Sequence, residues 1–135
     1  MEKKELNMKQ FTATKTVKAT PMTRTDAEKF LGRSITPADP KAEEGYLLLY
    51  PDGYYSWSPK EVFEKAYRLS ESFIDRLHIE EAELRHRIEA LHSFTLTNKY
   101  RDMPREEKVM LSSQFTAMHT YYNALATRLD FYLKF

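Results

Sequence analysis

Apolar residues in the C-terminal half of the chain recur every three or four positions, in two long stretches. The first stretch, residues 73–94, places on one helical face Phe73, Leu77, Leu84, Ile88 and Leu91. The second, residues 104–133, does the same with Leu111, Met118, Tyr122, Leu125 and Leu129. This spacing predicts two amphipathic helices, and the short break at residues 97–104 predicts that they fold back on each other as an antiparallel hairpin.

Several large apolar residues of the predicted hairpin fall partly outside this seam. At about 1.5 Å per residue each helix would be roughly 40 Å long, which is more than a small N-terminal unit could cover. Uncovered apolar surface on a soluble protein favours association, so we expect a homo-oligomer. The residues concerned are Phe94, Phe115, Phe131, Tyr132, Leu133 and Phe135.

The N-terminal half predicts strands. Residues 11–20 carry Thr and Val in a pattern typical of a strand. The runs at residues 45–50 and 54–58 flank Pro51-Asp52-Gly53, where Pro fixes φ and Gly accepts a positive φ, so the two runs should pair as a β-hairpin.

Two short helices complete this half. Thr25 and Glu28 have the spacing of a capping box, and Gly32 can end the helix that they begin. A second helix should start at Pro59, with Ser58 as its cap.

These elements predict an α+β fold. We expect a flexible arm at residues 1–10 and a small α+β module at residues 11–67, with an antiparallel β unit and a short helix. The long antiparallel α-helical hairpin should occupy residues 68–135. In a chain of this size about a third of the unfolded surface stays exposed, which again favours self-association.

Charge and composition narrow the possible functions. The net charge is +1, and Lys and Arg are interleaved with Asp and Glu, which argues against binding to duplex nucleic acid or to a membrane surface. No long apolar run or signal peptide occurs, so we expect a cytoplasmic protein. The absence of cysteine removes disulfides and thiolate ligands.

Metal or cofactor chemistry is not predicted. Glu83 and His86 have the spacing of half a di-metal site, as have Glu89 and His92, but the second helix offers no matching Glu-x-x-His. No glycine-rich phosphate loop or nucleophile motif is present either. We therefore expect a protein without cofactor or metal that binds a ligand and is not an enzyme.

Two stretches resemble phage proteins. The first stretch is RLHIEEAELRHRIEALHSF followed, after a short turn, by EEKVMLSSQFTAMHTYYNALATRL. It resembles the helical hairpin proteins related to one first catalogued in crAss-like phages. The shared positions are Leu91, Phe94, Glu106, Glu107, Ala117, Met118, Tyr121, Leu125, Arg128 and Leu129. An N-terminal module common in phage accessory proteins resembles FTATKTVKATPMTR with EGYLLLYPDGYYSWSPKEVFEKAY. The resemblance implies a phage accessory protein that acts in the host cytoplasm.

Helical-hairpin phage proteins include oligomeric sponges that sequester the nucleotide signals of bacterial immunity, such as cyclic oligonucleotides or cyclic ADP-ribose variants. The resemblance therefore implies an anti-defence function. Such a site needs cations for phosphate and rings that stack on a base. The candidate residues lie beside the seam, on the second helix at Gln114, Tyr121 and Arg128 and on the first at Arg76 and Glu80.

The same residues allow a purely structural interpretation. Aromatic residues at helical spacing usually serve packing, so Tyr121 would complete the core and Arg128 would pair with Asp75. Gln114 would then be a solvated edge residue, whereas its functional roles would be control of the helix register or ligand contact. In either case Glu80 or Glu81 should reach a tyrosine hydroxyl or an arginine, because a buried carboxylate without a partner is costly.

The alternative function is a protein-binding adaptor or inhibitor. The predicted β-hairpin is rich in aromatic residues, and an exposed face with Tyr54, Tyr55 and Trp57 could bind a host defence protein or a phage protein. The competing use of these rings is to cover the core of the module itself.

Overall fold

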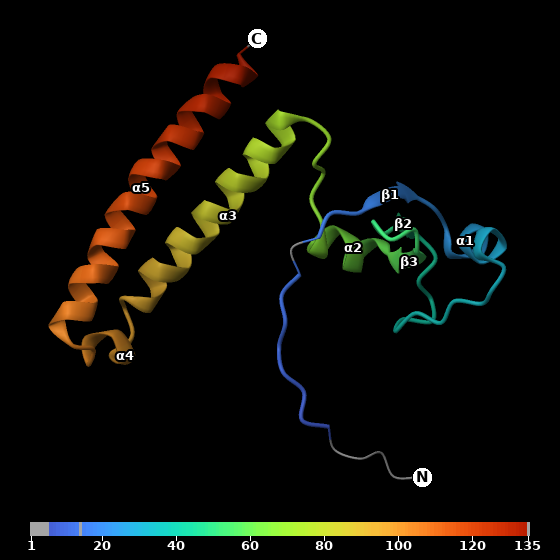
Figure 1. Cartoon of the computed structure of the whole chain (residues 1–135), viewed down its shortest axis with the longest axis horizontal. Helices are drawn as coiled ribbons and strands as arrows, with labels where there is room; N and C mark the ends of the chain where they lie inside the picture. Colours follow the sequence, from blue (N-terminus) through green and yellow to red (C-terminus); the bar gives the residue numbers. More distant parts are fainter. Residues whose placement is uncertain (1–5, 14, 135) are drawn as a thin grey trace. The chain divides into compact units, whose positions relative to one another are not determined.

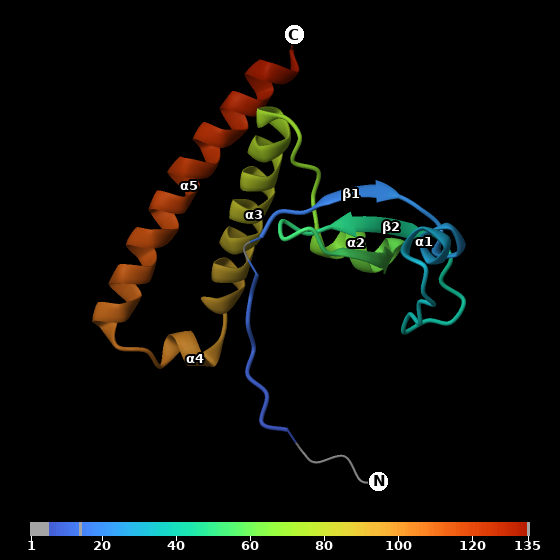
Figure 2. The same cartoon turned by 45° about the vertical axis from the view of Figure 1, so that its right-hand side comes forward.

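The computed structural model describes residues 6–13 and 15–134. The chain divides into two compact units, residues 1–67 and residues 68–135 (Figures 1 and 2). The elements in chain order are β1 (Lys18–Pro21), α1 (Arg24–Leu31), β2 (Gly45–Leu49), β3 (Tyr55–Pro59), α2 (Lys60–Ala66), α3 (Phe73–Phe94), α4 (Asn98–Arg101) and α5 (Arg105–Leu133). The predicted α+β fold is confirmed. Residues 1–5 of the predicted arm, Thr14 of the predicted first strand and Phe135 lie outside the described residues.

The first unit contains an antiparallel sheet with the strand order β1-β2-β3. In the predicted β-hairpin, Leu47 is paired with Trp57 and Leu48 with Ser56. Gly53 has a φ of 92°, so the turn uses the conformation that only glycine adopts readily. The hairpin prediction is confirmed.

The first strand begins later than predicted, at Lys18 instead of Phe11. Lys18 is paired with Leu49, which is the last residue of β2. Residues 15–17 lie beyond the end of β2, so they have no partner strand there. Strand propensity alone could not show where the partner ends.

The two short helices also begin at other residues than predicted. Thr23, not Thr25, caps α1, since its Oγ1 accepts a hydrogen bond from the Asp26 amide at 3.2 Å. The predicted end of α1 is confirmed, with Gly32 at a φ of 69°. Ser58 does not cap α2, because it lies in β3 opposite Tyr46, and α2 follows Pro59 without a side-chain cap.

Helices α1 and α2 cover opposite faces of the sheet. Phe30 of α1 meets Tyr55 edge-on, with ring centroids 5.2 Å apart. Phe63 of α2 stacks on Tyr46 at 4.1 Å. Because Tyr55 is paired with Leu49 and side chains alternate along a strand, Tyr46 and Tyr55 point to opposite faces. Both faces of the sheet therefore contribute to the core, and its buried residues are Ala27, Leu47, Leu48 and Trp57.

The second unit is the predicted hairpin. Helices α3 and α5 lie side by side in both views and are joined by α4, a short helix within the predicted turn (Figures 1 and 2). Leu77, Leu125 and Leu129 form its buried cluster, so the two predicted apolar faces pack against each other. Ser72 and Asp75 form a capping box at the start of α3. In the part of the chain that the structure describes, no helix is long and apolar enough to cross a membrane.

Replacing Leu125 by alanine should destabilise the hairpin strongly, because Leu125 is only 4% exposed at the centre of the leucine cluster. The expected loss in the free energy of unfolding is about 2–5 kcal/mol. Leu133→Ala is the matched control, since Leu133 is 65% exposed in the same helix, and it should cost less than about 0.5 kcal/mol. Urea denaturation followed by far-UV circular dichroism measures both. Equal losses in the two variants would contradict the described seam.

Candidate functional site

Two hydrogen bonds join the helices of the hairpin on either side of the leucine cluster. The Tyr121 hydroxyl donates to Glu80 Oε1, and the Tyr122 hydroxyl is hydrogen-bonded to Glu81. Adjacent residues of an α-helix point about 100° apart, so the two bonds lie on different sides of the seam. We call the side that carries Glu80 and Tyr121 the Glu80 face.

The expectation that Glu80 or Glu81 reaches a tyrosine or an arginine is confirmed for both residues. Glu81 also forms an ion pair with Arg85, with Nε and Oε1 3.4 Å apart. The hydrogen bond to Glu81 is the main reason why the pKa of Tyr122 is raised, and burial adds to the effect. The side with Glu81 is therefore internally paired.

The antiparallel packing brings Arg76 and Arg128 to the same level of the hairpin. On α3, Arg76 lies between Phe73 and Glu80, and on α5, Arg128 lies between Tyr121 and Tyr132. Phe73 and Tyr132 meet with ring centroids 4.9 Å apart, while Glu80 meets Tyr121. Both arginines are thus placed between the same two cross-helix contacts, and both are exposed.

Neither arginine pairs with a carboxylate among the described residues. Within residues 6–13 and 15–134 no ion pair involves Arg76 or Arg128. The expected pair between Arg128 and Asp75 is not formed, because Asp75 accepts hydrogen bonds from the amides of Ser72 and Glu71 at the start of α3. These bonds, with that of Ser72 the strongest, lower the pKa of Asp75. The two guanidinium groups remain able to bind an anion.

Tyr121 keeps much of its ring in solvent. Its side chain is 45% exposed, whereas its neighbour Tyr122 is half-buried. The interpretation that Tyr121 completes the core is therefore wrong. The tyrosine that packs at the edge of the core is Tyr122. Gln114, seven residues before Tyr121 on α5, is also exposed, and its Nε2 lies 3.9 Å from the Met118 sulfur.

The side of the hairpin opposite the Glu80 face shows stacked rings. Phe115 stacks with His92 at 6.4 Å and meets His119 edge-on at 4.6 Å. No group of three or more His, Asp or Glu side chains suited to a metal ion occurs among the residues described. These contacts are packing interactions that hold the helix ends in register.

The candidate partner residues of the first unit do not share one exposed face. Trp57 is 7% exposed, and its Nε1 donates to the Met22 carbonyl oxygen at 2.7 Å. It is a core residue, since the strand register places it against Leu47, so the prediction that it binds a partner is wrong. Tyr54 and Tyr55 remain 54% and 37% exposed.

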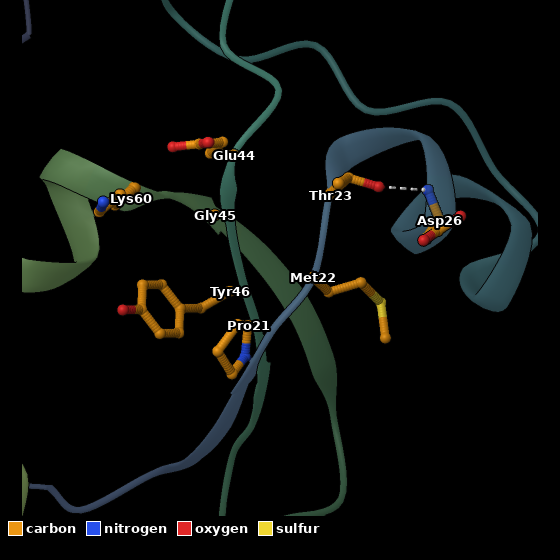
Figure 3. A pocket seen from close by; sticks show the side chains of 8 residues that line it. All are labelled: Pro21, Met22, Thr23, Asp26, Glu44, Gly45, Tyr46 and Lys60. Atoms are coloured by element: carbon orange, nitrogen blue, oxygen red, sulfur yellow. Dashed lines mark hydrogen bonds between the residues drawn. The ribbon is translucent and has the colours of Figure 1, made fainter.

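Sequence reasoning missed a cleft of about 440 Å³ in the first unit. It lies where β1 leads into α1 and where β2 begins (Figure 3). No motif or spacing in the sequence marks this place, because the lining residues come from segments that are far apart along the chain. The lining residues are Pro21, Met22, Thr23, Asp26, Glu44, Gly45, Tyr46 and Lys60.

A comparison with protein families concerns the hairpin. Residues 71–131 match the model of the Sequestin family. The Sequestin match begins just before α3 and ends near the end of α5, so it includes Arg76, Glu80, Gln114, Tyr121 and Arg128 and nothing of the first unit. No curated protein and no solved structure matches the chain. The phage resemblance stays a prediction.

The Tyr122–Glu81 hydrogen bond should make the stability of the hairpin depend on alkaline pH. The pKa of Tyr122 is raised in the folded protein, so the bond stabilises fully below the unfolded tyrosine pKa of about 10 and is lost as the pH rises through the folded pKa. Tyr122→Phe should therefore lower the Tm at pH 8. The difference in Tm between this variant and the parent protein should shrink at higher pH.

The control for this experiment is Tyr132→Phe, because Tyr132 packs against Phe73 through its ring. Its Tm difference from the parent should be constant over the same pH range. Thermal melts between pH 8 and the alkaline limit of folding measure both variants. A Tyr122→Phe difference that does not change with pH would contradict the role of the hydrogen bond.

Proposed function

We propose that this chain is a non-enzymatic binding protein that sequesters a nucleotide signal on the Glu80 face. The observation that carries the proposal is the pair of arginines, Arg76 and Arg128, which lie at one level of the hairpin without an ion-pair partner among the described residues. Guanidinium groups bind phosphate by paired, charge-assisted hydrogen bonds. An exposed arginine pair is therefore suited to a phosphodiester or pyrophosphate.

The groups beside the arginines suit the rest of a nucleotide. The exposed ring of Tyr121 offers a surface on which a base can stack, and its hydroxyl is tied to Glu80, so its orientation is restricted. An ionised carboxylate has two acceptor oxygens, and Tyr121 bonds to one of them, Oε1. The other oxygen of Glu80 can accept from a ribose hydroxyl or an exocyclic amine, and Gln114 can hydrogen-bond a base edge.

The Sequestin match supports the proposal, since the name of this family is consistent with sequestering a signalling molecule and the match spans the whole Glu80 face. In the proposed context the protein is encoded by a phage, acts in the host cytoplasm and counters an immune signal of the cyclic oligonucleotide or cyclic ADP-ribose type. Self-association would add a second wall to the exposed site. The adaptor hypothesis is weakened, because Trp57 is buried.

Native mass spectrometry of the purified chain with a pool of cyclic dinucleotides, cyclic trinucleotides and cyclic ADP-ribose isomers tests the proposal. We expect one nucleotide class to be retained at fixed stoichiometry and the same nucleotide to raise the Tm. Retention of none of these compounds would overturn the proposal for the signals in the pool.

Arg128→Ala should weaken nucleotide binding by about ten- to a hundredfold, because a charge-assisted hydrogen bond to phosphate is lost. Arg85→Ala is the matched control, since Arg85 is an arginine of the same hairpin that pairs with Glu81 on the other side of the seam. It should leave affinity unchanged. Isothermal titration calorimetry with the retained nucleotide measures both, and equal effects of the two variants would place the ligand elsewhere.

A further inference from the structure

Hydrogen bonds join the chain segments that line the cleft of the first unit. The Met22 amide donates to the Gly45 carbonyl at 2.9 Å, and the Lys60 amide donates to the Glu44 carbonyl at 3.0 Å. Trp57 Nε1 donates to the other side of Met22, at the carbonyl oxygen, at 2.7 Å. The three chain segments that line the cleft are therefore fixed relative to one another. Small-molecule sites are usually preformed in this way and have volumes of about 300–1,000 Å³, a range that includes this cleft.

One wall of the cleft carries an aromatic ring in a fixed orientation. Tyr46 stacks on Phe63 at 4.1 Å, and its hydroxyl donates to Glu64 Oε1 at 3.0 Å. This bond is the main reason why the pKa of Tyr46 is raised, so the hydroxyl stays protonated. In Figure 3 the Tyr46 ring lies below Lys60 and beside Pro21, which gives this wall an apolar surface.

The charged residues of the cleft have opposite signs and do not neutralise one another. Within the described ranges, Asp26, Glu44 and Lys60 form no ion pair. Figure 3 shows Glu44 and Lys60 on the side of Tyr46, and Asp26 on the opposite side beyond Met22. The cleft thus offers one ammonium group, two carboxylates and apolar surface from Tyr46, Pro21 and Met22.

We propose that this cleft binds a small zwitterion that carries an ammonium and a carboxylate group, as a free amino acid or the ends of a short peptide do. The ligand carboxylate would pair with Lys60, and the ligand ammonium with Glu44 or Asp26. Its side chain would pack on Tyr46. The excess of carboxylates and the electron-rich ring favour a cationic group over a phosphate, which distinguishes this ligand from the nucleotide proposed for the hairpin.

Titration of the ¹⁵N-labelled full chain with four leucine derivatives tests the proposal. L-leucine and leucyl-leucine have both charges, N-acetyl-leucine lacks the ammonium and leucinamide lacks the carboxylate. We expect a zwitterion to shift the amide signals of Met22, Gly45 and Lys60, with at least about tenfold weaker binding of the two singly charged compounds. Binding of L-leucine alone would identify an amino-acid site, and binding of the dipeptide alone would identify a peptide site.

Two variants and a control complete the test. Lys60→Met and Glu44→Gln should each weaken zwitterion binding by about tenfold or more, while Lys41→Met, in the exposed loop before β2, should not change it. Gly45 is not substituted, because a side chain there would collide with the Trp57 ring and the Ser58 carbonyl. No shift with any compound, equal binding of all four, or full binding by both cleft variants would overturn the proposal. Each of these results leaves the nucleotide proposal untouched, because it concerns the other unit.

Discussion

The contact between Leu77 of α3 and Leu125 and Leu129 of α5 determines which residues of the hairpin share a surface. Once these leucines are packed, the two tyrosine–carboxylate bonds can form only on the two flanks of the seam, one on each. One flank then collects groups that satisfy each other, such as Glu81, Tyr122 and Arg85. The other flank collects two arginines without acidic partners among the described residues. The asymmetry in charge pairing between the two flanks follows from this packing.

In the first unit the comparable constraint is the hydrogen bond from the Trp57 indole to the Met22 carbonyl. It ties the end of β1 to β3, although β2 lies between them in the sheet. The bond satisfies a buried donor that would otherwise destabilise the core. It also fixes the chain where β1 ends and α1 begins, and therefore the position of one wall of the cleft.

Hydrophobic periodicity was sufficient to predict the hairpin, because a repeat of three to four residues over 22 and 29 residues is hard to produce in any other fold. The β-hairpin was predictable from Pro51-Asp52-Gly53 for a similar reason. The limits of β1 were not, because a strand ends where its partner ends and the partner is known only from the fold. The capping residue of α1 was missed because Thr23 and Thr25 are equally suited to the position by residue type.

The candidate site was only partly accessible to sequence reasoning. Periodicity placed Tyr122 on the seam and Tyr121 beside it, but only the packing of α3 against α5 shows that Tyr121 stays 45% exposed instead of completing the core. An ion pair between Arg128 and Asp75 was plausible from charge. It does not form because Asp75 takes part in the capping box of α3 instead. The cleft had no sequence signature, since its lining comes from three separate segments that only the fold assembles.

Gly45 has two roles that cannot be changed independently. Its backbone is buried against the Trp57 ring and the Ser58 carbonyl, and the space where a side chain would stand is already occupied by them. The Gly45 backbone also lines the cleft, where its carbonyl accepts the hydrogen bond of the Met22 amide. Any side chain at this position would collide with the core of the sheet and displace the wall of the cleft that β2 provides. Selection for folding alone should therefore keep glycine here in descendants of this chain, whether or not a ligand of the cleft is still used.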